Sequence, residues 1–95
     1  MLKIVKLQMG EGGMEFALIG RLQAEHVNEV RELIRQERSA IVFDLRELQL
    51  VDRSAVQFLA SCERDGVVLR NCAPHIRDWV TREAGKQSVG NGDEG

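Results

Sequence analysis

The sequence predicts a single α/β domain built on a four-stranded mixed sheet with about three helices, in the order ββαβαβα. Three observations lead to this fold class. Two alternating stretches near the N-terminus are separated by glycines, a short apolar run precedes a helical pattern and a second apolar run, and three segments repeat apolar residues at intervals of three and four. A chain of 95 residues forms one small core, and its helices most economically cover one main face of the sheet.

The first two strands are predicted over Leu2 to Met9 and Met14 to Ile19. The Gly-Glu-Gly-Gly segment between them tolerates the positive backbone angles of a tight turn, which indicates an antiparallel hairpin. Such glycines also occur in phosphate-binding loops. No GK[ST] ending follows, however, and a strand rather than a helix comes next, so we interpret this turn as structural.

The first helix is predicted from Ala24 to about Arg38, after Gly20-Arg21-Leu22 ends the second strand. Acidic residues lie near its start and arginines near its end, which complements the helix dipole. Its apolar residues share one face, namely Val27, Val30, Leu33 and Ile34. We expect His26 to be solvated, because the sequence places no other chemical group near it.

The central unit begins with Ala40 to Leu45, a continuously apolar run that ends on Asp44-Leu45. Its length and β-branched residues predict an interior strand covered on both faces. A short polar loop then leads to a helix with Asp52 as its N-cap and Ser54 in its first turn. Asp65-Gly66 ends that helix, and the run that starts at Val67 forms a parallel neighbour of the first strand of the unit.

The last helix is predicted to start near Pro74, whose missing amide costs nothing in a first turn. Ile76, Trp79 and Val80 recur at the spacing of a packed face, so Trp79 is expected to anchor the core. Gly85 is expected to stop the helix. The predicted domain therefore spans residues 1–84, and residues 85–95 are predicted to be a disordered tail because they are rich in glycine and nearly free of apolar residues.

Composition excludes several classes of function. A net charge of −2 is too balanced to indicate a nucleic-acid or anionic-membrane partner, and the chain has no tyrosine for bases to stack on. No apolar run approaches membrane-spanning length, so we expect a cytoplasmic protein, either a monomer or a weak homodimer. Cys62 and Cys72 lack the spacing of a metal knuckle and are expected to be reduced, buried thiols; we expect no metal or cofactor.

Three short motifs resemble the STAS family, the domain shared by bacterial anti-sigma factor antagonists and the cytoplasmic tails of sulfate transporters. The resemblance covers roughly residues 2 to 82, by the order of elements and by Gly20-Arg21-Leu22, Phe43-Asp44-Leu45 and Val51-Asp52-Arg53-Ser54-Ala55. Antagonists of the family typically read Asp-Ser-Ser-Gly or Asp-Ser-Thr-Gly at the last motif, and a partner kinase phosphorylates its third residue. The resemblance thus implies a STAS-like fold with Ser54 as the candidate phosphorylation site.

A phosphate at Ser54 would meet free amides and the positive end of the helix dipole, so the helix would survive while about −2 of charge appeared on the surface. Asp44 is expected beside this loop, helping to hold it. Two residues depart from the family motif. Arg53 replaces a small hydroxyl residue, and Ala55 replaces a glycine that lets another backbone approach. The alternative interpretation is that Ser54 only helps to cap the helix.

The resemblance implies a regulatory module that docks an anti-sigma factor or Ser/Thr kinase. It also implies that phosphorylation of Ser54 switches the binding. The predicted partner-binding residues are Asp44, Asp52, Arg53, Ser54, Ala55 and Gln57. The alternative is a non-switching STAS subunit of a phospholipid-transport ABC system, which would bind the ATPase through the same helix. A constitutive assembly role would tolerate Arg53 and Ala55 more easily.

An enzyme is not expected, although Ser54, Asp52, Asp44, His75 and Cys72 include residue types that catalysis uses. The sequence contains no nucleophile elbow, no two-histidine metal spacing and no phosphate-cradling loop. A domain this small also has little room for a closed pocket.

Overall fold

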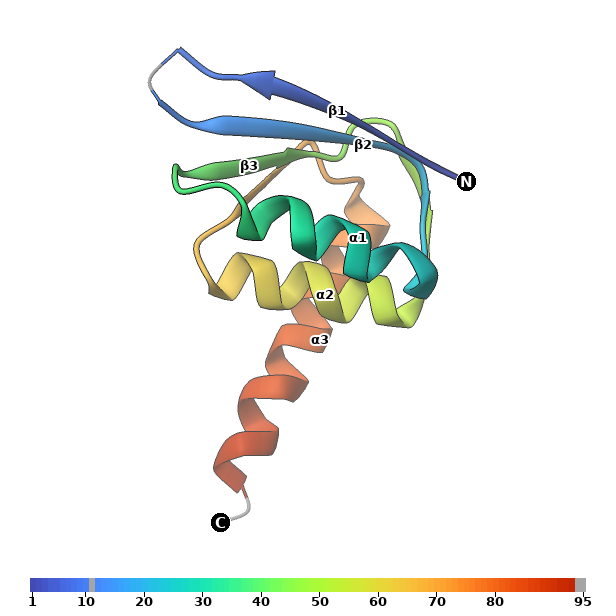
Figure 1. The fold of residues 1–95 in the computed structure, drawn as a ribbon. Coiled ribbons are helices and arrows are strands. Elements are labelled where there is room, and N and C mark those ends of the chain that lie inside the picture. The colour runs from blue at the N-terminus through green and yellow to red at the C-terminus, as the bar shows by residue number, and fades with distance from the viewer. Residues whose placement is uncertain (11, 94–95) are drawn as a thin grey trace.

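The computed structural model describes residues 1–10 and 12–93, and over these residues it contains five strands and three helices (Figure 1). In chain order they are β1 (Leu2–Gln8), β2 (Met14–Leu22), α1 (Ala24–Arg35), β3 (Ile41–Asp44), β4 (Leu48–Val51), α2 (Arg53–Arg64), β5 (Val68–Arg70) and α3 (Pro74–Asp93). The predicted α/β class and its three helices are confirmed.

The five strands form one mixed sheet in which β1, β2, β3 and β5 are neighbours in that order. β1 pairs antiparallel with β2, as the predicted hairpin requires, whereas β3 and β5 are parallel. β3 therefore lies in the interior of the sheet, and the central strand–helix–strand unit is confirmed.

The prediction of four strands is wrong by one, because residues 48–51 form β4 where the sequence predicts a polar loop. The nine-residue β2 is longer than its neighbour β3, which pairs only with Met14 to Ala17. The remaining edge of β2, from Gly20 to Leu22, pairs in parallel with β4. A long strand thus offers free backbone groups that a four-residue segment satisfies, and Leu48 of that segment is buried in the core.

All three helices lie on one face of the sheet (Figure 1), which confirms the predicted one-sided cover. The expectation that β3 is covered on both faces is therefore wrong, because the described helices cover only one of them. Phe43 faces the helices and meets Phe16 edge-on, with 6.3 Å between ring centroids. The core between sheet and helices includes the fully buried side chains Phe16, Leu18, Leu22, Val30, Phe43, Leu45, Val56, Leu59, Ile76 and Val80.

Gly20 sits where β2 passes from β3 to β4, and the pairing register shifts between Gly20 and Arg21. Its φ is +99°, and a Cβ atom there would lie 2.7 Å from the Met1 carbonyl oxygen. Both facts favour glycine, because other residues are strained at positive φ and would clash with backbone. The Gly20-Arg21-Leu22 motif therefore marks the bend that delivers the chain to α1.

The helix ends differ in how well the sequence predicts them. Gly66 has φ of +104° directly after α2, as expected for a C-terminal glycine cap. α1 ends at Arg35, a few residues before the predicted Arg38. α3 continues through Gly85 to Asp93, so the predicted stop at Gly85 is wrong; a glycine inside a helix costs only about 1 kcal/mol relative to alanine and does not forbid it.

The predicted disordered tail, residues 85–95, overlaps this helix, and its last two residues lie outside the described residues. Figure 1 shows the distal part of α3 projecting away from the sheet. Among the described residues, no helix has both the length and the apolar character needed to span a membrane.

Candidate functional site

Asp52 joins the starts of two helices. As the N-cap of α2, its Oδ1 accepts a hydrogen bond of 2.9 Å from the Ala55 N–H, as predicted. Its Oδ2 accepts a second bond of 2.8 Å from the N–H of Ala24, the first residue of α1. One carboxylate thus satisfies amides of two helices, and it positions the opening of α2 against the end of β2.

Ser54 lies in the first turn of α2 and is exposed to solvent. Among the described residues its hydroxyl group makes no hydrogen bond, because Asp52 supplies the side-chain cap of this helix. The Ser54 hydroxyl therefore stands free at the positive end of the helix dipole.

Arg53 and Gln57, one turn apart on α2, both point to Glu83 of α3. The Arg53 Nε lies 3.8 Å from the Glu83 carboxylate, and the Gln57 amide donates to that carboxylate at 3.4 Å. Lys86 contributes a second cation at 3.5 Å. Burial of Glu83 opposes its ionisation, but the Gln57 hydrogen bond and the charges of Lys86 and Arg53 outweigh burial and lower the pKa of Glu83.

The sequence interpretation missed Glu83, which is only 3% exposed. A signal was present, since Glu83 follows Ile76 and Val80 at intervals of four and three and so falls on the buried stripe of α3. A carboxylate in such a position needs a partner. Arg53, one of the two residues that depart from the family motif, is one of those partners.

Ala55 is fully buried, so its methyl group packs in the core rather than on the surface. A docked partner would meet Arg53, Ser54 and Gln57 and not the Ala55 side chain. The alanine at this motif position is therefore explained by packing inside the domain.

Asp44 lies at the end of β3, on the sheet face opposite the helices. Its Oδ1 accepts hydrogen bonds of 3.0 Å from the Asn71 side chain and from the Arg46 N–H. Both bonds lower the pKa of Asp44, and the bond from Asn71 has the larger effect. Asn71 has a left-handed backbone conformation, with φ of 57°. The contacts described for Asp44 therefore hold the turns after β3 and β5, and none of them reaches the opening of α2.

His26 is not the solvated side chain that the sequence predicts. Its side chain is 13% exposed, and its Nδ1 accepts a 3.1 Å hydrogen bond from the Gln23 N–H just before α1. The ring thus fixes the start of α1.

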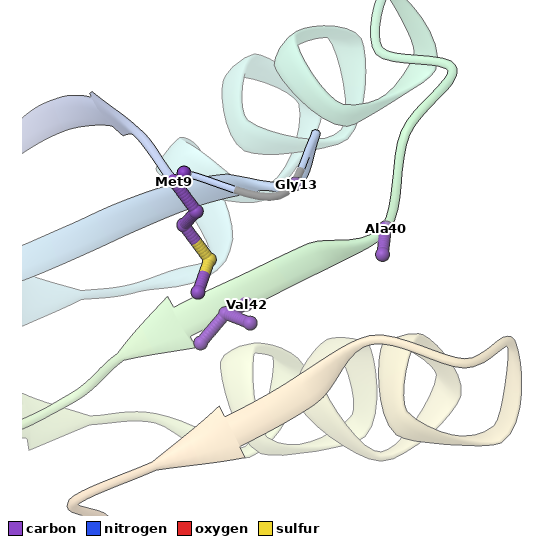
Figure 2. Close-up of a pocket in the computed structure, with 5 residues that line it drawn as sticks. Met9, Gly13, Ala40 and Val42 are labelled. Carbon is purple, nitrogen blue, oxygen red and sulfur yellow. The ribbon is translucent and has the colours of Figure 1, made fainter.

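A groove of about 490 Å³ lies beside the β1–β2 turn and is lined by apolar atoms and backbone (Figure 2). Figure 2 shows the Met9 side chain reaching toward Val42 there. The β1–β2 turn lies at the end of the sheet away from the start of α2 (Figure 1), and none of the described residues that line the groove is titratable. It does not extend the site around Ser54.

The described residues contain no group of three or more histidine, cysteine or acidic side chains that could hold a metal ion. Cys62 and Cys72 are both free thiols, the first buried and the second half-buried. Burial raises the pKa of Cys62 to about 12, which leaves it a thiol and a poor nucleophile at neutral pH.

The fold is that of STAS domains. An anti-sigma factor antagonist, SpoIIAA in its unphosphorylated form, aligns with a TM-score of 0.64 and 18% identity over 80% of this chain and 79% of that chain. The STAS domain of an anti-sigma factor antagonist from Rhodobacter sphaeroides aligns with a TM-score of 0.56 and 18% identity over 77% of this chain and 92% of that chain.

A third structure with the same fold is an uncharacterised Shewanella loihica protein of the DUF3478 family, described as SpoIIAA-like. It aligns with a TM-score of 0.54 and 16% identity over 90% of this chain and 78% of that chain. No family sequence model matches the chain, and no curated protein matches it significantly in sequence. The STAS fold expected from the three motifs is confirmed by structure.

Proposed function

We propose that this protein is a cytoplasmic regulatory module that works by binding another protein through the exposed start of α2, and that phosphorylation of Ser54 switches the binding. The supporting observation is the free, exposed Ser54 hydroxyl in the first turn of a helix that Asp52 already caps. A kinase could modify this hydroxyl without removing the bonds that hold the helix.

A phosphate at Ser54 would add about −2 of charge where backbone amides and the helix dipole favour an anion. The domain would stay folded, while a partner docked on α2 would meet a new charge that is either repelled or buried without a counter-ion. Two structures with this fold are anti-sigma factor antagonists. We therefore propose an anti-sigma factor or Ser/Thr kinase as the partner, with binding rather than catalysis as the activity and no cofactor.

The test is an affinity pull-down from the native cytoplasm with wild type, Ser54→Asp and Ser54→Ala as baits, followed by calorimetric titration of the retained protein. Gln36→Glu is a matched control, because it adds a charge at the exposed C-terminal end of α1, away from Ser54. We expect wild type, Ser54→Ala and Gln36→Glu to retain the same anti-sigma factor or kinase, and Ser54→Asp to bind it about tenfold or more weakly.

Two results would contradict the proposal. If wild type and Ser54→Asp retain a transporter ATPase equally, the start of α2 is a constitutive assembly surface of an ABC system and the switch is wrong. If no bait retains a protein that binds on titration, the chain is not a binding module of this kind.

A further inference from the structure

The ion pairs between α2 and α3 differ at the two ends of the contact. Near the C-terminal end of α2, Glu63 and Arg77 pair one to one, with 2.7 and 3.0 Å between their charged atoms. At the N-terminal end of α2, the single carboxylate of Glu83 is shared by Arg53 and Lys86. The ion-pair group at the end that carries Ser54 therefore holds one cation more than anions, whereas the pair of Glu63 and Arg77 is balanced.

The surplus charge faces solvent. The Glu83 side chain is 4% exposed, whereas those of Arg53 and Lys86 are 66% and 65% exposed. The anion thus lies beneath the two cations and cannot be reached by a docking protein. The neighbouring Arg82 is paired one to one with Asp78, so it adds no unbalanced charge to this end.

Asp52 is a second acidic residue at this end, and it is half-buried. Both carboxylate oxygens of Asp52 accept backbone N–H groups of the helix starts. The α2 dipole adds partial positive charge at the same place. The exposed cations that share Glu83, Arg53 and Lys86, thus form a cationic patch with the first turn of α2, although the whole chain carries a net charge of −2.

We infer that the partner presents an acidic protein surface, whose carboxylates dock against Arg53 and Lys86. This inference rests on the proposed docking site and adds the chemistry of the partner. A basic surface would be repelled by the cationic patch, and an apolar surface would strip water from two cations without replacing it. An acidic partner is also the kind that a phosphate on the adjacent Ser54 repels most strongly.

The test uses a probe of known chemistry because the partner is unidentified. The probe is a helical peptide with glutamates along one face, and the matched peptide carries glutamine at those positions. Each is titrated at low salt into the full-length ¹⁵N-labelled protein, and amide shifts are followed by NMR. We expect the glutamate peptide at about 1 mM to shift amides at Arg53 to Gln57 and at Arg82 to Lys86, and the glutamine peptide to shift neither.

Variants locate the effect. Arg53→Ala and Lys86→Ala should each weaken the glutamate peptide about two- to fivefold, and the double variant should remove the shifts. Arg35→Ala is the control, because Arg35 is 68% exposed and pairs one to one with Glu32 on α1. It should leave the titration unchanged, and added salt should weaken the wild-type binding.

Three results would overturn the inference. These are an absence of shifts with the glutamate peptide, equal shifts with both peptides, and loss of binding in Arg35→Ala as large as in Arg53→Ala. A separate titration uses inorganic phosphate alone. If phosphate shifts the same amides at the same concentration, the inference is wrong and the cationic patch is a small-anion site. None of these outcomes bears on whether Ser54→Asp releases the native partner, so this inference can fail while the proposed function stands.

Discussion

At the scale of single residues, Asp52 has a structural role that its place in a motif does not reveal. Its sequence position predicts the cap on α2, because it stands directly before an amphipathic helix. The second hydrogen bond, to the Ala24 amide, joins residues 28 apart in the chain. No local pattern predicts such a contact, and the same holds for the pairing of Glu83 with Arg53.

We expect Asp52→Ala to lower the free energy of unfolding by about 2 kcal/mol, because amides at the starts of α1 and α2 both lose their acceptor. Urea denaturation followed by circular dichroism measures this change. Asp52→Ser should recover part of the loss, since one hydroxyl oxygen can cap α2 but cannot also reach α1. Ser54→Ala is the control and should change stability by less than about 0.5 kcal/mol. Equal effects of Asp52→Ala and Ser54→Ala would contradict the two-helix cap.

At the scale of secondary-structure elements, most of the fold was predictable and the exceptions have physical causes. Alternation, apolar runs and capping residues placed four strands and three helices. β4 was missed because four residues with two exposed side chains carry little periodic signal, and their pairing depends on the length of β2. α3 was predicted too short because a glycine inside a helix lowers stability without breaking the hydrogen-bonded chain.

The site was predicted less well than the fold, because it depends on contacts between elements. Asp52, Arg53, Ser54 and Gln57 do gather at the start of α2. Asp44 instead bonds the turns after β3 and β5, and Ala55 lies in the core. A residue list taken from one motif cannot separate side chains that face a partner from those that face inward.

The pair formed by Glu63 and Arg77 fastens α2 to α3 and makes this contact depend on pH. The hydrogen bonds from Arg77 outweigh desolvation and lower the pKa of Glu63 below its ordinary value of 4.5. Above that value the carboxylate is charged in both the folded and the unfolded chain, so the pair contributes in full. As the pH falls toward the lowered pKa, the unfolded state takes up the proton first and the contribution is lost.

A double-mutant cycle with Glu63→Gln and Arg77→Gln measures this dependence. We expect a coupling free energy of at most about 1 kcal/mol at neutral pH, because both side chains are more than a third exposed. The coupling should shrink as the pH falls below 4.5 toward the lowered pKa of Glu63. A coupling that stays constant from neutral to acidic pH would show that packing, and not the ion pair, joins the two residues.

At the scale of the whole molecule, the one-sided arrangement leaves an uncovered sheet face. The pairing register aligns Leu7, Glu15, Val42 and Val68 in one row across β1, β2, β3 and β5 on that face. Leu7 is 49% exposed and Val68 51%. These strands are seven, nine, four and three residues long. With a spacing of about 4.8 Å they cover only about 400 Å², which is half of what each partner in a stable complex typically buries.

We therefore expect a monomer of 10.7 kDa at micromolar concentration, measured by sedimentation equilibrium. Leu7→Lys and Val68→Lys should leave both this mass and the free energy of unfolding nearly unchanged, within about 0.5 kcal/mol. Phe43→Lys, on the opposite face of β3, is the contrasting variant and should prevent folding because it buries a charge in the core. A wild-type dimer that Leu7→Lys dissociates would contradict the expectation.

The shared cap at Asp52 has a consequence for how such chains diverge over time. An ancestor that lost its kinase would be free to exchange the serine, yet it would still need the aspartate to keep two helices in register. The acidic half of the motif would therefore outlive the regulatory half. An aspartate at this position in a distant descendant would indicate that the fold is preserved. It would not indicate that phosphorylation still regulates the descendant.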